Sequence, residues 1–278
     1  MRTKLLTLLL TATLGLLCNS CQQESRTPFF VQITDPQLGF ITESTDIQPE
    51  MDNMSRIAEA VNRLRPDFVV FTGDLVQWRT DKGAWEGFEQ IRNMFDSDIK
   101  LHFVPGNHDV GDKVGQLDVE SFVERYGEDR FVHNAPAYTA IGYNSCLLKA
   151  LAPEEAELYE WFTDSLEAAS ERGLPIVVMA HHPIYVESPD EEDAGVNLPK
   201  TIRNKYLNLL SHYGVSLSLS GHLHHCVTAT YGHTRLATSG AAGRPLGEEG
   251  SGITIVTIGK QGPEATFYEI EKIPTSID

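Results

Sequence analysis

Short apolar runs that end in carboxylate, amide or imidazole side chains constrain the fold of this chain more than any other feature. Five such ends occur in the sequence, at Asp35, Asp74, Asn107-His108-Asp109, His181-His182 and His222-Leu223-His224. Each run has the length of a strand and the near-continuous hydrophobicity of a strand buried on both faces. Because ligands of open α/β sheets collect beyond the carboxyl ends of the strands, we expect these side chains to meet at one site.

The first three runs alternate with helical patterns. Strands are predicted at Phe29–Thr34, Phe68–Thr72 and Leu101–Val104, and amphipathic helices at Met51–Leu64 and Trp85–Phe95. The helices are indicated by apolar residues that recur at intervals of three and four. This alternation favours parallel strand pairing with right-handed crossovers.

The middle of the chain continues the pattern. Further helices are predicted at Asp118–Tyr126, Pro153–Ala169 and Pro199–Tyr213. Single strands are predicted at Ile176–Ala180 and Val215–Ser220. A strand pair that turns at Tyr143-Asn144 is predicted at Tyr138–Ile141 and Cys146–Ala150.

Beyond His225, short strands separated by glycine turns replace the alternation. They are predicted at Val227–Tyr231, Thr234–Thr238, Ile253–Ile258 and Ala265–Ile270, and they indicate a second, mostly antiparallel sheet. Two sheets flanked by helices give an α/β fold of the four-layer α/β/β/α sandwich type. Because no linker or change of composition interrupts the chain, we expect residues 21–278 to form a single domain.

The first 20 residues have the pattern of an export signal. Arg2 and Lys4 precede the uncharged run Leu5–Leu17, which is short for a bilayer span but suits a secretory signal. Ser20-Cys21 then resembles a bacterial lipoprotein signal with Cys21 acylated; an ordinary cleaved signal peptide is the alternative. We therefore expect an exported protein of the bacterial cell envelope, in the periplasm or at the outer membrane, that contacts the membrane only through its N-terminal lipid.

Charge and cysteine usage restrict the partners. The net charge of −17 opposes the binding of nucleic acid polymers, whereas a small phosphorylated substrate is compatible if local cations dominate its pocket. Without the first 21 residues, the chain keeps Cys146 and Cys226. These two either pair in an oxidising compartment or lie separately buried.

The residue types at the strand ends suit divalent metal ions. Carboxylates, an amide oxygen and imidazoles are ligands that fit Mn, Fe or Zn. Two such ions about 3.5–4 Å apart can clamp a phosphoryl group and generate a hydroxide nucleophile. We therefore expect two divalent metal ions as cofactors.

Together, the strand ends resemble the signature of the calcineurin-like metallophosphoesterases, over roughly Phe29 to His224. The matching motifs are Asp35, Gly73-Asp74, Gly106-Asn107-His108-Asp109, His181-His182-Pro183 and Gly221-His222-Leu223-His224. The finer motifs Thr34-Asp35-Pro36-Gln37 and Gly73-Asp74-Leu75-Val76 are similar to the branch named for calcineurin-like phosphoesterase domain-containing protein one. The complete set is specific, although each motif alone is weak.

The resemblance implies a role for each motif residue. Asp74 would bridge both ions, Asp35 and His224 would hold the first, and the second would be held by Asn107, His181 and His222. His108 would lie over the phosphate and protonate the leaving oxygen, and Asp109 would orient His108.

Gln37 departs from the pattern, because most of the superfamily has histidine at this position. Its amide oxygen can ligate but is neutral and cannot shuttle a proton, so we expect weaker binding of the first metal or a harder metal such as Mn or Fe. Gln77 stands where purple acid phosphatases have tyrosine, so a tyrosinate–Fe(III) band is not expected. His182 would line the pocket or hydrogen-bond a ligand. Arg244 would neutralise a phosphate oxygen or remain a solvated loop charge.

The predicted function is a metal-dependent phosphoesterase that uses a hydroxide held by two metal ions. Two alternatives stay open at this point. One is a phosphodiesterase acting on nucleotides or lipid headgroups. The other is a degenerate scaffold, with Gln37 as the lesion, that only binds a phosphorylated ligand. The metal content distinguishes the degenerate scaffold from the two enzymes. A content close to two ions per chain supports catalysis, and one ion or none supports the scaffold.

Overall fold

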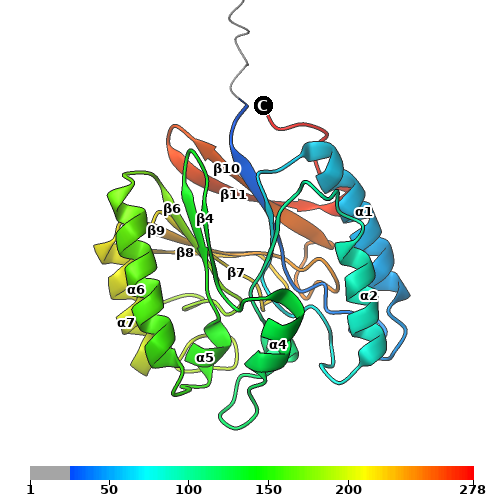
Figure 1. The fold of residues 1–278 in the computed structure, drawn as a ribbon, viewed down its shortest axis with the longest axis horizontal. Coiled ribbons are helices and arrows are strands. Elements are labelled where there is room, and N and C mark those ends of the chain that lie inside the picture. The colour runs from blue at the N-terminus through cyan, green and yellow to red at the C-terminus, as the bar shows by residue number, and fades with distance from the viewer. Residues whose placement is uncertain (1–25) are drawn as a thin grey trace, which may run out of the picture.

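The first sheet follows the predicted alternation of strands and helices. The computed structural model describes residues 26–278, and in it β1 (Phe29–Ile33), β2 (Val69–Phe71) and β3 (Leu101–Phe103) are parallel neighbours. Helices α1 (Gln48–Leu64) and α2 (Lys82–Arg92) connect them and cover one face of this sheet (Figure 1). All five residues of β1 are buried, as its hydrophobicity predicts.

The second sheet has a parallel centre. Its strands lie in the order β4-β5-β6-β7-β9-β8, and the pairs β5-β6, β6-β7 and β7-β9 are parallel. Their bounds are β4 (Phe131–Asn134), β5 (Thr139–Gly142), β6 (Ile176–Met179), β7 (Leu217–Ser220), β8 (Val227–Tyr231) and β9 (Thr234–Thr238). Helices α6 (Glu155–Glu171) and α7 (Lys200–His212) cover its outer face (Figure 1).

The prediction of a separate antiparallel sheet beyond His225 was wrong. The hairpin β8-β9 extends the second sheet, whereas the hairpin of β10 (Gly252–Gly259) and β11 (Gly262–Glu269) joins the first sheet, where β10 pairs antiparallel with β1. A glycine turn predicts a hairpin, but the free sheet edges decide what the hairpin pairs with. The chain ends in a short 3-10 helix, η1 (Ile270–Lys272).

The segment predicted as a strand at Cys146–Ala150 is a helix instead. Helix α5 (Ser145–Lys149) begins at Asn144, whose side chain accepts a hydrogen bond from the backbone N–H of Cys146 at 3.0 Å. Short apolar runs do not distinguish a buried strand from a buried helix, and the N-cap settles the difference. The antiparallel partner of β5 is β4, a strand that was not predicted from the sequence.

Three apolar layers hold the sandwich together, which confirms the four-layer α/β/β/α architecture. Side chains such as Phe30, Val70 and Val177 fill the space between the sheets. Separate clusters join the first sheet to α1 and α2, and the second sheet to α6 and α7.

The predicted site lies at one end of the sandwich. The short helices α3 (Asn107–Val110), α4 (Val119–Tyr126) and α5 follow the carboxyl ends of β3 and β5, and α4 and α5 lie together at that end (Figure 1). Within residues 26–278 no helix is both long and apolar enough to cross a membrane. The predicted signal and Cys21 lie outside the described residues. Cys146 is a buried free thiol and Cys226 a half-buried one, so the two do not pair.

A buried histidine in β3 links stability to pH. The His102 ring stacks on Phe131 and hydrogen-bonds His133, with 3.0 Å between Nε2 and Nδ1. Burial, reinforced by Lys100 and His133, lowers the pKa of His102 to about 3. Below the ordinary histidine pKa of 6.5, the unfolded chain binds a proton at this residue that the folded chain does not bind. This histidine therefore makes the free energy of unfolding fall as the pH decreases from 6.5 toward 3.

We expect His102→Phe to reduce this acid sensitivity, because phenylalanine keeps the stacking and cannot titrate. Between pH 7 and pH 5 the variant should lose roughly 1–2 kcal/mol less unfolding free energy than the wild type, as measured by urea unfolding. The exposed His233→Phe is the matched control and should behave as the wild type. An unchanged pH slope in His102→Phe would contradict the assignment.

Candidate metal centre

The loops after β1 and β2 bring two carboxylates together. Backbone hydrogen bonds run from Asp35 N to Gly73 O (3.1 Å) and from Gln37 N to Asp74 O (2.9 Å), so the loops continue side by side beyond the sheet. Asp35 and Asp74 are both buried. Each offers an oxygen to a cluster with His181 in which all ligand atoms lie within 4.8 Å of one another.

Backbone carbonyls fix the protonation of three histidine rings. His181 donates Nδ1–H to Thr72 O (2.9 Å), His222 donates Nε2–H to Gly195 O (3.2 Å), and His224 donates Nδ1–H to Arg244 O (2.6 Å). In a neutral ring the second nitrogen then carries a lone pair and no proton. Each ring is therefore prepared to coordinate a cation through that nitrogen.

Around His181 these lone pairs face other acceptors. Its Nε2 lies 3.1 Å from Asn107 Oδ1, 3.1 Å from His222 Nδ1 and 3.3 Å from Asp74 Oδ2. Four acceptor atoms at these distances repel one another unless a positive charge lies between them. A single proton satisfies one such pair, whereas a metal ion satisfies all four, so this donor set fits a metal ion.

A second group of acceptors has the same property. His224 Nε2 lies 3.5 Å from Asp35 Oδ1. That oxygen and Gln37 Oε1 are among the buried side-chain atoms of the described chain that accept no hydrogen bond. A buried acceptor without a donor costs about 1–3 kcal/mol, and a cation removes that cost. The residues present thus fit cations at two neighbouring points.

The charges of the cluster support this interpretation. Burial disfavours the ionised carboxylate of Asp74, but His181, His108 and His222 hold its pKa well below the usual range. Burial likewise opposes a charge on His181, yet Asp74 and Asp35 raise its pKa to about 9. Burial and the neighbouring His181 lower the pKa of His222 to about 4. The site therefore attracts positive charge to the point between Asp74 and His181.

Backbone strain marks the same residues. Five of the predicted ligands have positive φ: Asp35 (52°), Gln37 (41°), Asp74 (50°), His222 (72°) and His224 (57°). Left-handed backbone is unfavourable for residues other than glycine and concentrates at functional sites. Gln37, the residue that departs from the expected pattern, has the same left-handed backbone as the four ligands that match it.

His108 lies beside Asp74, but Asp109 does not orient it. The His108 ring donates Nδ1–H to Gln77 O (2.7 Å), and its backbone N–H donates to Asp74 Oδ1 (2.8 Å). Asp109 instead accepts backbone hydrogen bonds, from Leu75 (2.8 Å) and Val76 (3.4 Å) at Oδ1 and from Gly106 (2.8 Å) at Oδ2. Contrary to expectation, Asp109 therefore does not hydrogen-bond the His108 ring but links the loop after β2 to the loop after β3. Burial and Asp74 raise the pKa of Asp109 to about 7.

The two predicted substrate contacts have other neighbours. His182 is only 1% exposed, hydrogen-bonds Ser145 Oγ (3.1 Å) and packs its ring 4.5 Å from that of His222, so burial removes it from the pocket surface. The Arg244 guanidinium pairs with Glu43 at 2.8 Å, and its backbone carbonyl holds His224. A phosphate contact by Arg244 stays a prediction.

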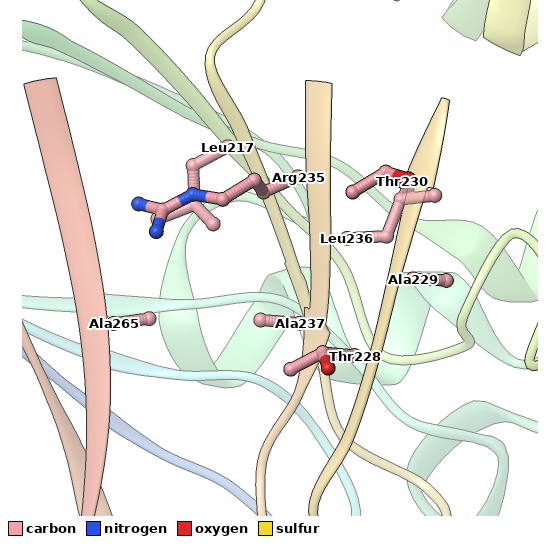
Figure 2. A pocket seen from close by; sticks show the side chains of 8 residues that line it. All are labelled: Leu217, Thr228, Ala229, Thr230, Arg235, Leu236, Ala237 and Ala265. Carbon is pink, nitrogen blue, oxygen red and sulfur yellow. The ribbon is translucent and has the colours of Figure 1, made fainter. Parts of the chain in front are cut away.

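A cavity of the described chain lies away from this cluster. It has a volume of about 390 Å³ and opens between the sheets, lined by side chains of β7, β8, β9 and β11 (Figure 2). The Arg235 side chain extends toward the strand that carries Ala265 (Figure 2). Its guanidinium donates a hydrogen bond to Pro263 O. No carboxylate or imidazole lines this cavity, so the convergence of polar groups, rather than cavity size, locates the candidate site.

Several contributors were missed by sequence reasoning. The carbonyls of Thr72 and Gly195 fix two histidines, and Thr34 Oγ1 donates to Asp35 Oδ2 at 2.7 Å. Backbone carbonyls leave no signal in a sequence, because every residue has one. Thr34 was visible as the residue before Asp35, but its hydroxyl resembles that of any strand threonine.

Taken together, the sandwich fold and the buried cluster of carboxylates, amide and imidazoles define a metal-dependent hydrolase of phosphoric esters. A family model described as calcineurin-like phosphoesterase matches residues 30–226. The chain therefore belongs to the calcineurin-like phosphoesterase family.

Individual comparisons agree with this assignment. The chain is 28% identical to the serine/threonine-protein phosphatase CPPED1 of Rattus norvegicus, over 94% of this chain and 90% of the relative. A dimetal phosphatase structure from Danio rerio has the same fold, with a TM-score of 0.65 and 14% identity over 88% of this chain and 99% of the other. Purple acid phosphatase PPD1 from yellow lupin gives a TM-score of 0.66 at 13% identity, over 89% and 52%.

Gly221 provides a test of the site geometry. A Cβ at this position would lie 1.9 Å from Thr34 Oγ1 and 2.6 Å from Asp35 Oδ2. We expect Gly221→Ala to displace Asp35 and to weaken the binding of one metal ion by about tenfold or more, measured by titration calorimetry with Mn²⁺. Gly259→Ala, whose Cβ would meet nothing closer than 4.0 Å, is the control. Equal affinities in both variants would show that Asp35 is not a ligand.

Proposed function

We propose that this chain holds two divalent metal ions and hydrolyses phosphate monoesters. Asp35, Gln37, Asp74 and His224 would hold one ion, and the other would be held by Asp74, Asn107, His181 and His222. Divalent ions held there neutralise charge on a phosphoryl group and activate water as a nucleophile. Mn, Fe and Zn all suit this mixture of oxygen and imidazole ligands. The observation that carries the proposal is the set of buried imidazole nitrogens that face carboxylate and amide oxygens at 3.1–3.5 Å.

His108 supplies the proton in this mechanism. Its Nδ1–H is held by Gln77 O, so Nε2 is the nitrogen left to exchange a proton with the substrate. His108 is half-buried, so it is partly open to solvent. A proton donated to the leaving oxygen stabilises the alcohol as the bond to phosphorus breaks.

The substrate class follows from the relatives and from charge. The similarity to a serine/threonine-protein phosphatase over 94% of the chain supports phosphoserine and phosphothreonine esters as substrates. These are alkyl esters, whose alkoxide leaves poorly without a proton donor such as His108. The net charge of −17 favours small substrates over polyanionic polymers.

The proposal predicts metal-dependent hydrolysis of phosphoserine and phosphothreonine peptides by the Mn- or Fe-loaded chain. Asp74→Asn should lower kcat by at least about a hundredfold, because it removes a charge placed between the two ligand groups. The exposed Asp164→Asn in α6 is the matched control. The idea fails if the loaded protein hydrolyses no monoester, or if Asp74→Asn keeps full activity.

A second prediction isolates the role of His108. His108→Asn should reduce kcat for a phosphoserine peptide by roughly 10²–10⁴-fold. The reduction for p-nitrophenyl phosphate should be much smaller, because nitrophenolate leaves without a proton. His233→Asn, at an exposed position, serves as the control. Equal losses with both substrates would argue against a leaving-group role.

A further inference from the structure

Two glutamines lie side by side where the β1 and β2 loops run together. A parallel bridge joins Leu38 to Val76, and Gln77 N donates to Leu38 O at 3.0 Å. Gln37 N in turn donates to Asp74 O at 2.9 Å. Gln37 precedes Leu38 and Gln77 follows Val76, so these backbone contacts bring the two glutamine side chains close to each other.

A hydrogen bond between the side chains orients the Gln37 amide. Gln37 Nε2 donates to Gln77 Oε1 at 2.8 Å. Gln37 Oε1 is directed away from that contact, is buried and accepts no hydrogen bond from the described chain. Gln37 is only 2% exposed, so this oxygen is shielded from bulk solvent. An acceptor held in this way is ready for a cation.

We propose that Gln77 is a positioning residue for the first metal ion, because it holds the Gln37 amide with its oxygen, and not its nitrogen, toward the ligand group. The inference rests on the proposed function, since it assumes that Asp35, His224 and Gln37 share an ion. An amide group can turn by 180° and exchange its oxygen for an NH₂ group that repels a cation. With Gln77 Oε1 in place, this exchange would lose the 2.8 Å hydrogen bond and bring two carbonyl oxygens together.

The same residue also reaches the proton donor, through its main chain. Gln77 O accepts the Nδ1–H of His108 at 2.7 Å. The side chain of Gln77 thus acts on the metal ligand and its backbone acts on the acid. Side-chain substitutions separate the two, because they leave the carbonyl in place.

The test measures metal affinity rather than turnover. Mn²⁺ is titrated into metal-free protein by calorimetry, with wild type, Gln77→Met, Gln77→Glu and the exposed control Gln90→Met. Gln77→Met should weaken the lower-affinity ion by about 10–100-fold, the range for residues that orient a ligand. Gln77→Glu offers only acceptors, so it holds Gln37 in the same orientation and should keep the wild-type affinity or exceed it.

A double-variant cycle removes the remaining alternatives. In a Gln37→His background an imidazole replaces the amide, so adding Gln77→Met should no longer weaken the first ion. A thermal unfolding curve for each variant shows that the fold is intact.

The outcomes distinguish the inference from the proposed function. A wild type that binds two ions, together with a Gln77→Met variant that binds both with unchanged affinity, overturns the role of Gln77 alone. An equal loss of affinity in the wild-type and Gln37→His backgrounds also overturns it, because the effect then does not pass through Gln37. A wild type that binds fewer than two ions overturns the two-metal centre and this inference with it.

Discussion

A histidine coordinates a cation through one nitrogen only when its proton resides on the other, and the whole centre depends on this constraint. Backbone carbonyls of Thr72, Gly195 and Arg244 each accept the N–H of one imidazole ring, which in the neutral ring leaves the opposite nitrogen with a lone pair. Those lone pairs then face oxygens that also lack protons, so the arrangement is stable only around positive charge. The affinity of this site for a cation therefore depends on backbone hydrogen bonds to the ligands as well as on the ligands themselves.

Close approach of the β2 and β3 loops makes this geometry possible. A Cβ on Gly73 would lie 2.4 Å from Gly106 N, and one on Gly106 would lie 2.2 Å from Asp74 N. The contact lets the His108 backbone N–H donate to Asp74. The buried carboxylate of Asp109 joins the two loops, because it accepts hydrogen bonds from the backbone of both. The strained backbone of the ligands is sustained by such contacts, because isolated residues would relax from positive φ.

Much of the fold could be predicted from periodicity. The alternation from Phe29 to Leu101 led directly to parallel strands covered by two helices, because the apolar positions of each element must face a core. The predictions that were wrong concern segments whose local sequence pattern fits more than one structure. Helix α5 and a strand have similar short apolar runs, and only Asn144 as an N-cap distinguishes them. The hairpin β10-β11 pairs with β1 across more than 200 residues of sequence, and no local signal specifies such a partner.

The sequence by itself determined the ligand types, their order along the chain and their location at strand ends. From these followed the α/β sandwich, the metal dependence and the family. Only the tertiary structure decided which side chains support others. In the structure Asp109 accepts hydrogen bonds from backbone N–H groups, and the buried His182 ring packs against that of His222. Gln37 hydrogen-bonds Gln77. The physical reason is that ligand identity is a property of a residue, whereas the orientation of an amide or an imidazole is set by hydrogen bonds between segments remote in sequence.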